Sequence, residues 1–167
     1  MIEQDYKNFH IVFIDDHSAD ETLKETAKFV KDRNFPDSKI QYIKNMETKY
    51  PAYNILMAAY EYCQEDEIQV IVEGNDFFIG RTTLKLVNAI YQNNKKLWMA
   101  YTSSLTSSYE YGDSKPPVYD SRVVSKDNER LGEHFMSSLS TWRINLIRNI
   151  PLSNFLKKNG EFLDVSF

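Results

Sequence analysis

The sequence predicts an α/β fold in which a mostly parallel sheet carries helices on both faces. Short apolar runs alternate with segments of helical periodicity, which is the pattern of βαβ crossovers. Acidic residues directly follow two of the predicted strands. The chain has 167 residues, of which 42% are hydrophobic and 26% charged, and this composition is typical of a globular domain. We therefore expect a single domain over residues 1–167.

The first predicted strand is the continuous apolar run 11–14, which contains β-branched residues and is typical of a buried strand. An acidic loop, residues 15–17, follows it. Ser18 and Glu21 have the spacing of a capping box, in which each side chain binds a free backbone N–H of the other residue. The helix after this box is indicated by apolar residues at helical spacing: Leu23, Ala27 and Val30.

The same alternation continues along the chain. The strand at 68–72 is the most apolar and is expected to be the most deeply buried. Residues 102–128 are polar and tyrosine-rich, with no clean periodicity, and a loop of that length is usually functional or disordered. The remaining predictions are strands at 40–43 and 97–101, and helices at 53–63, 82–91 and 141–149, the last ended by Pro151.

Composition excludes several classes of function. The net charge is −4 and the basic residues are scattered, so the electrostatic footprint of a nucleic-acid-binding protein is missing. Cys63 is the single cysteine, which rules out an internal disulfide and a cluster of thiolate ligands. The N-terminus lacks the features of a signal peptide, and no apolar run approaches the ~20 residues of a membrane span. We expect a cytoplasmic protein.

Two polar clusters stand at the ends of predicted strands, where open α/β sheets bind their ligands. Asp15 or Asp16 can accept a hydrogen bond from a uracil imide or hold a ribose hydroxyl; alternatively, Asp16 supports the N-terminus of the next helix. Glu73, Asn75 and Asp76 offer oxygen ligands for a hard cation that bridges phosphates. The alternative for this second cluster is an acidic turn between strand and helix.

Other side chains leave their roles open. Arg143 and Arg148 can pair with phosphate or lie solvated on a helix flank. His134 is either structural or close to an acceptor. Four tyrosines can stack on a sugar, line a partner interface or fill the core: residues 101, 109, 111 and 119.

Three stretches carry a family resemblance. Residues 11–22, IVFIDDHSADET, resemble the DDGSTDGT signature of family-2 glycosyltransferases. Tyr53-Asn54 and the alanines at 58–59 are similar to the asparagine- and alanine-containing stretch before that family's third strand. Residues 72–76, VEGND, are similar to its LDADD or DGDD motif, whose D-x-D portion holds the metal and the donor. The resemblance is good over residues 4–101 and weak thereafter.

The resemblance implies a Rossmann-like GT-A fold and inverting transfer of a sugar from a nucleotide-diphosphate donor, UDP-linked, to an unknown acceptor. It implies a nucleotide-sugar-binding half over residues 1–101 and a partial acceptor-side half over 102–167. No motif identifies the residue that acts as the catalytic base. A divalent cation, Mn²⁺ or Mg²⁺, would be held by Asn75 and Asp76. The implied nucleotide-sugar-binding residues are Asp15, Asp16, Ser18, Asn54, Glu73 and Asp76.

The chain departs from the family pattern at these motifs and at its ends. Asn75 is a neutral amide where an anionic metal ligand is expected, which weakens cation binding. Glu73 is one methylene longer than aspartate. Family members have a strand before residue 4 and an acceptor-binding segment beyond Phe167, so the resemblance implies a domain trimmed at both ends. The alternative function is therefore a catalytically inactive module whose exposed sheet edge binds a protein partner in a larger assembly.

Overall fold

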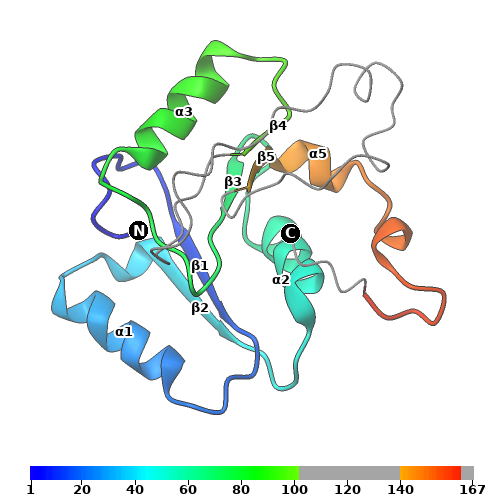
Figure 1. Ribbon diagram of the computed structural model, residues 1–167, viewed down its shortest axis with the longest axis horizontal. Coiled ribbons are helices and arrows are strands. Elements are labelled where there is room, and N and C mark those ends of the chain that lie inside the picture. Colours follow the sequence, from blue (N-terminus) through cyan, green and yellow to red (C-terminus); the bar gives the residue numbers. More distant parts are fainter. Residues whose placement is uncertain (102–139, 163–167) are drawn as a thin grey trace, which may run out of the picture.

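The computed structural model describes residues 1–101 and 140–162, which form an α/β arrangement with two small sheets (Figure 1). In chain order the elements are β1 (Ile11–Asp15), α1 (Thr22–Asp32), a 3₁₀ turn (Asp37–Lys39), β2 (Ile40–Lys44), α2 (Tyr50–Glu61), β3 (Ile68–Ile71), α3 (Thr83–Asn93), β4 (Met99–Tyr101), β5 (Ser140–Arg143), α5 (Ile144–Arg148) and a second 3₁₀ turn (Leu152–Phe155).

The order of strands and helices up to residue 101 is confirmed, with shifted boundaries. Helix α3 buries the predicted inward face through Leu84, Val87 and Tyr91. Helix α2 begins at Tyr50 instead of residue 53. The prediction of one helix over 141–149 is wrong in its first part, because Ser140–Arg143 is a strand and only Ile144–Arg148 is helical. Strand-forming residues there pair with two other strands, and this tertiary pairing overrides the helical spacing.

The predicted capping box is also wrong. Helix α1 begins at Thr22 with Glu21 as its N-cap, and no side-chain bond caps it in the expected way. The Thr22 amide instead donates to Asp20 Oδ1 at 3.0 Å. The Ser18 amide donates to Asp15 Oδ1 at 2.8 Å, so Ser18 belongs to the turn after β1 and not to the helix. An aspartate close to the helix start satisfies the free amide better than the more distant serine.

The described strands form two separate sheets. Strands β1 and β2 pair in parallel, with Ile11 opposite Ile40 and Asp15 opposite Lys44. Strand β5 lies between β3 and β4 and runs antiparallel to both. Among the described strands, the expected parallel pairing is therefore found only between β1 and β2. The physical reason is that β5 comes from a distant part of the sequence and satisfies the backbone groups of both its neighbours.

The hydrophobic core lies around α2, β5 and α5. Its buried members are Leu56, Ala59, Trp142, Ile144 and Ile147. Strand β5 is the most buried described strand, whereas β3 buries only one residue, Gln69, and its apolar side chains stay half-buried. The prediction that the 68–72 strand is the most deeply buried is thus wrong. Gln69 connects β3 to the core, because Trp142 Nε1 donates to its Oε1 at 2.7 Å and its own Nε2 donates to the Ile55 carbonyl at 3.1 Å.

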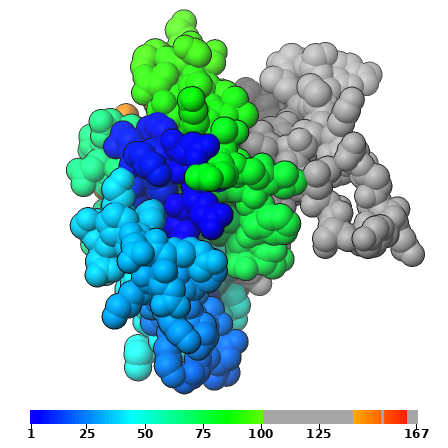
Figure 2. All heavy atoms as spheres, turned by 90° about the vertical axis from the view of Figure 1, so that its left-hand side faces the viewer, coloured from blue at the N-terminus to red at the C-terminus, as the bar shows by residue number. Residues whose placement is uncertain are grey.

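A cavity of about 620 Å³ explains why β3 is only half-buried. Strands β1 and β3 are terminal strands of their sheets, and residues of both line this cavity together with residues of α2 and α3. The N-terminal segment, dark blue in Figure 2, lies beside the green α3 region. Gln4 fixes it there, since its side chain donates to the Gly80 carbonyl and accepts from the Leu84 amide near the start of α3.

Some predictions fall outside the described residues. These concern the loop at 102–128, the tyrosines at 109, 111 and 119, and His134. Within the ranges that the structure does describe, none of the helices is both long enough and apolar enough to span a bilayer.

Candidate functional site

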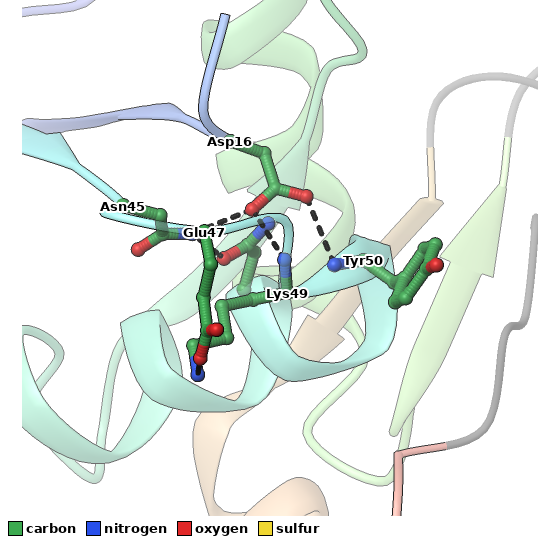
Figure 3. Close-up of polar contacts among 6 residues, drawn as sticks. Asp16, Asn45, Glu47, Lys49 and Tyr50 are labelled. Carbon is green, nitrogen blue, oxygen red and sulfur yellow. Dashed lines mark hydrogen bonds and ion pairs between the residues drawn. The ribbon is translucent and has the colours of Figure 1, made fainter.

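Polar side chains gather where β1 and β2 end and α2 begins (Figure 3). Asp16 stands at the centre of this group. Its Oδ1 accepts from Asn45 Nδ2 at 2.7 Å and from the Lys49 amide at 2.8 Å, and its Oδ2 accepts from the Tyr50 amide at 2.9 Å. Lys49 is the N-cap of α2 and Tyr50 its first residue. Asp16 therefore does support a helix N-terminus, but that of α2 across the site and not that of α1, which follows it in sequence.

These hydrogen bonds keep Asp16 ionised. Burial by itself raises the pKa of Asp16, but hydrogen bonds from Asn45 and from the Lys49 and Tyr50 amides outweigh this effect, and the pKa lies below its ordinary value. A negative charge is also favourable beside the N-terminus of a helix. The carboxylate is consequently an anionic acceptor at neutral pH, held in one orientation by three donors.

Asn54 joins the same network. Asn45 Nδ2 also donates to Asn54 Oδ1 at 2.8 Å, so Asn45 bridges β1 and α2. The structure thus brings two predicted site residues, Asp16 and Asn54, to the two sides of one amide. The sequence reasoning missed Asn45. Its position directly after β2 was the available signal, because neighbouring parallel strands end at the same edge of a sheet.

Backbone strain accompanies this network. His17, which follows Asp16, has φ of 69°, and Tyr50, whose amide binds Asp16, has φ of 67°. Non-glycine residues in this left-handed region cost of order 1 kcal/mol each, and such strain gathers at functional sites. The Asp16 hydrogen bonds hold at least the Tyr50 backbone in place. A strained, pre-formed loop is the expected device for presenting polar groups to a ligand.

Asp15 has a different environment. Its side chain is buried, with 3% of the residue exposed, and its Oδ1 accepts from the Ser18 amide. Lys44 Nζ lies 3.7 Å from Oδ2, an oxygen that is buried without a hydrogen bond. The Ser18 hydrogen bond lowers the pKa of Asp15, burial opposes it, and the net pKa lies below the ordinary value. The buried Asp15 therefore stabilises the turn after β1, whereas Asp16 binds the backbone at the start of α2.

The second cluster follows β3. A backbone hydrogen bond from the Asp76 amide to the Glu73 carbonyl, 3.0 Å long, closes the turn. Glu73 and Asn75 are exposed and Asp76 is half-buried. Two carboxylates and an amide form an all-oxygen donor set, which is the type that Mg²⁺ and Mn²⁺ prefer. In the described part of the chain, no hydrogen bond or ion pair joins this turn to the Asp16 network.

The expectation that Arg143 and Arg148 lie solvated on a helix flank is wrong, and their pairing with phosphate stays a prediction. Arg143 donates to the carbonyls of Tyr91, Asn94 and Leu97, at the end of α3 and beyond it. Arg148 donates to three carbonyls at the end of α2, those of Ala59, Tyr60 and Cys63. Each arginine therefore caps a helix C-terminus, where free carbonyls and the helix dipole favour a cation.

Comparison with known proteins places the chain in a family context. A family model described as glycosyl transferase family 2 matches residues 1–147. The matched span contains both polar clusters and all the described strands. No curated protein matches the chain significantly. The mixed α/β architecture, with a parallel β1–β2 pair, is compatible with the GT-A fold of that family, although both sheets are small.

Proposed function

Because the chain belongs to glycosyl transferase family 2, we propose that it binds a UDP-linked sugar and transfers the sugar, with inversion, to an acceptor hydroxyl. The observation that carries the proposal is the Asp16 network. Asp16 is anionic, oriented by three donors and located at the carboxyl end of a parallel strand. Ligands of open α/β sheets bind at this edge.

Each predicted residue has a role in this proposal. Asp16 accepts the imide N–H of the uracil ring through lone pairs that the protein donors leave free. Asp15 and Ser18 form the turn that places Asp16, and so act by positioning. Asn54 extends the polar surface along α2. Residues 1–101 would then bind the nucleotide sugar, and residues 102–167 would contribute the acceptor side.

The turn after β3 is assigned to the diphosphate side of the donor. Family-2 enzymes often use divalent cations, and the oxygen donors of Asn75 and Asp76 would hold Mn²⁺ or Mg²⁺ there, with Glu73 directed to the ribose. The cation, when bound, supplies positive charge to the diphosphate. Because Asn75 carries no charge, we expect its cation affinity to be lower than that of an all-carboxylate site.

The proposed reaction is a single displacement. The acceptor oxygen forms a bond to the anomeric carbon while the bond from that carbon to the diphosphate oxygen breaks, and the diphosphate leaves with the electron pair. A carboxylate base takes the proton of the acceptor hydroxyl. In this proposal the described residues orient the donor, and the single displacement inverts the anomeric carbon.

Calorimetric titration with UDP-sugars, with and without Mn²⁺, tests the proposal. We expect binding to the wild type and, for Asp16→Asn, an affinity at least about tenfold lower, since a charge-assisted hydrogen bond is worth about 1.5–3 kcal/mol. Asp20→Asn is the matched control, because Asp20 binds only its neighbour Thr22 in the described structure. Failure of every nucleotide sugar to bind, or equal binding by the Asp16 variant, would contradict the proposal.

The cavity between the sheets supports a second candidate function, a catalytically inactive module that binds a protein partner. Strands β1 and β3 are both terminal strands, and an extended apolar segment of a partner would find backbone groups and apolar side chains along the cavity. Hydrogen exchange distinguishes the two functions. A partner strand would slow exchange along β1 and β3, whereas a nucleotide sugar would slow it at residues 15–18 and 73–76.

A further inference from the structure

Three side chains with metal-ligating atoms meet where β1 and β3 begin. His10 directly precedes β1, Glu67 directly precedes β3, and Cys63 follows the end of α2. His10 Nδ1 lies 3.5 Å from Glu67 Oε1, and the ligand atoms of all three residues lie within 4.8 Å of one another. Among the described residues, this is the group of three histidine, cysteine and acidic side chains whose ligand atoms lie close enough to share one ion. Cys63 and Glu67 belong to the same connection between α2 and β3, and the fold brings His10 from the start of β1 to them.

The separation between His10 and Glu67 matches the dimensions of a zinc site, and both lie within 4.8 Å of the Cys63 sulfur. Zinc binds imidazole nitrogen and carboxylate oxygen at about 2.0–2.2 Å and thiolate sulfur at about 2.3 Å, so two tetrahedral ligand atoms lie roughly 3.3–3.6 Å apart. The observed separation of 3.5 Å between His10 and Glu67 falls in this range. One nitrogen, one sulfur and one oxygen ligand suit Zn²⁺, whereas Mg²⁺ and Mn²⁺ prefer oxygen alone.

Neighbouring groups already orient the ligands. Glu67 Oε2 accepts from the Gln64 amide at 2.7 Å, which leaves Oε1 directed toward His10. Arg148 donates to the Cys63 backbone carbonyl at 2.7 Å and so holds the backbone that carries the thiol. A hydrogen bond to the ligand side chain itself, as at Glu67, fixes the direction of metal ligands in zinc proteins. All three ligand residues also line the cavity between the sheets, which offers an ion a route of entry.

The Cys63 thiol lies beside the pair formed by His10 and Glu67. Cys63 is half-buried and packs against the hydrophobic core. The observation that favours a ligand role is geometric: the sulfur lies in the same group of ligand atoms as the imidazole of His10 and the carboxylate of Glu67.

We propose that His10 Nδ1, Cys63 Sγ and Glu67 Oε1 bind one Zn²⁺ ion, with a fourth position open to water. The ion would connect the start of β1 to the start of β3 and so clamp the two sheets together. This site lies at the opposite strand ends from Asp16 and Glu73, and is therefore separate from the cation of the sugar donor. It does not depend on glycosyl transfer.

Metal titration of the purified chain tests this site. Competition against a chromophoric chelator should give one Zn²⁺ ion per chain. Thermal unfolding should show a higher melting temperature with Zn²⁺ than without it. Co²⁺ bound in place of Zn²⁺ should show a thiolate charge-transfer absorption. Cys63→Ser and His10→Asn should each weaken Zn²⁺ binding at least about tenfold, which is the lower end of what even outer-shell changes cost. His17→Asn and Glu61→Gln are the matched controls, and they should bind as the wild type does.

Three results would overturn the proposal: no Zn²⁺ bound, wild-type affinity in either ligand variant, or a Zn²⁺ affinity that Asp76→Asn removes and His10→Asn does not. Because Cys63→Ser could unfold the chain through loss of packing, the exposed His10 gives the decisive variant. His10→Asn should melt like the wild type without metal and lose the Zn²⁺-induced rise. If Zn²⁺ still raises the melting temperature of His10→Asn, the proposed site is wrong, whatever Cys63→Ser shows.

Discussion

The β1–β2 sheet and the β3–β5–β4 sheet are stabilised in different ways. In β1 and β2 only Ile11 and Asp15 are buried, and the end of that sheet is held by the hydrogen bonds of Asp16. In the second sheet, β5 buries Ser140, Thr141 and Trp142 against the hydrophobic core. Polar bonds thus organise the region around Asp16, and apolar packing organises the β3–β5–β4 sheet.

This difference shows where strain is tolerated. His17 and Tyr50, both with positive φ, flank the polar network at the end of the first sheet. The third such non-glycine residue, Asn34, follows α1, so none of the described ones lies in the second sheet. A rigid packed half can support a strained, polar half, because its own stability does not depend on the geometry of the site.

The largest expected effect is in the packed half. Trp142→Ala removes a large buried side chain and leaves Gln69 Oε1 without its donor, so we expect the free energy of unfolding to fall by about 3–5 kcal/mol. Trp98, which is 49% exposed, is the matched control, and Trp98→Ala should cost less than about 1 kcal/mol. Urea unfolding followed by far-UV circular dichroism measures both, and equal losses would mean that burial in the core does not set the cost of removing a tryptophan.

A smaller effect is expected where Arg148 caps α2. Arg148→Met keeps much of the side-chain volume but leaves three carbonyls without a donor, and its side chain is only 25% exposed, so we expect a loss of about 2 kcal/mol. Arg33→Met provides the comparison in the first half, since Arg33 lies at the end of α1 with an exposed side chain. That variant should lose less than about 1 kcal/mol, and a larger loss there than for Arg148 would contradict the comparison.

The smallest loss of stability is expected in the polar half, and it should depend on pH. Asp16→Asn should lower the free energy of unfolding by about 1–2 kcal/mol at pH 7, because the neutral amide loses the negative charge that the helix N-terminus and three donors stabilise. The folded pKa of Asp16 is lowered from an ordinary value of 3.8, so its contribution is present above that pH and is lost as the pH falls through the folded pKa.

Measuring the free energy of unfolding of the wild type and Asp16→Asn between pH 7 and pH 3 therefore sharpens the comparison of the two sheets. The difference between the wild type and Asp16→Asn should stay constant above about pH 5 and shrink below about pH 4. The deficit of Trp142→Ala should show no such decline, since no titrating group is removed. A difference for Asp16→Asn that persists undiminished at pH 3 would mean that the carboxylate charge contributes nothing.

Local patterns predicted the alternation of strands and helices up to residue 101, because apolar periodicity and breaks in it are properties of neighbouring residues. They failed at Ser140–Arg143, where a spacing typical of a helix belongs to the central strand of a sheet. They also predicted a capping role for Ser18 that Asp20 takes instead. Each error concerns a hydrogen-bond partner that the spacing of residues along the sequence does not identify. The partners are β3 and β4 for Ser140–Arg143 and Asp20 for the Thr22 amide.

The residue types and their positions at strand ends were determined by the sequence alone, and with them the family that the chain belongs to. The tertiary structure alone decided which helix Asp16 caps, which carbonyls Arg143 and Arg148 satisfy, and that His10, Cys63 and Glu67 meet at one point. The reason is physical. Propensity and periodicity act between near neighbours, whereas a hydrogen-bond partner or a metal ligand is chosen by whatever the folded chain brings within about 3–4 Å.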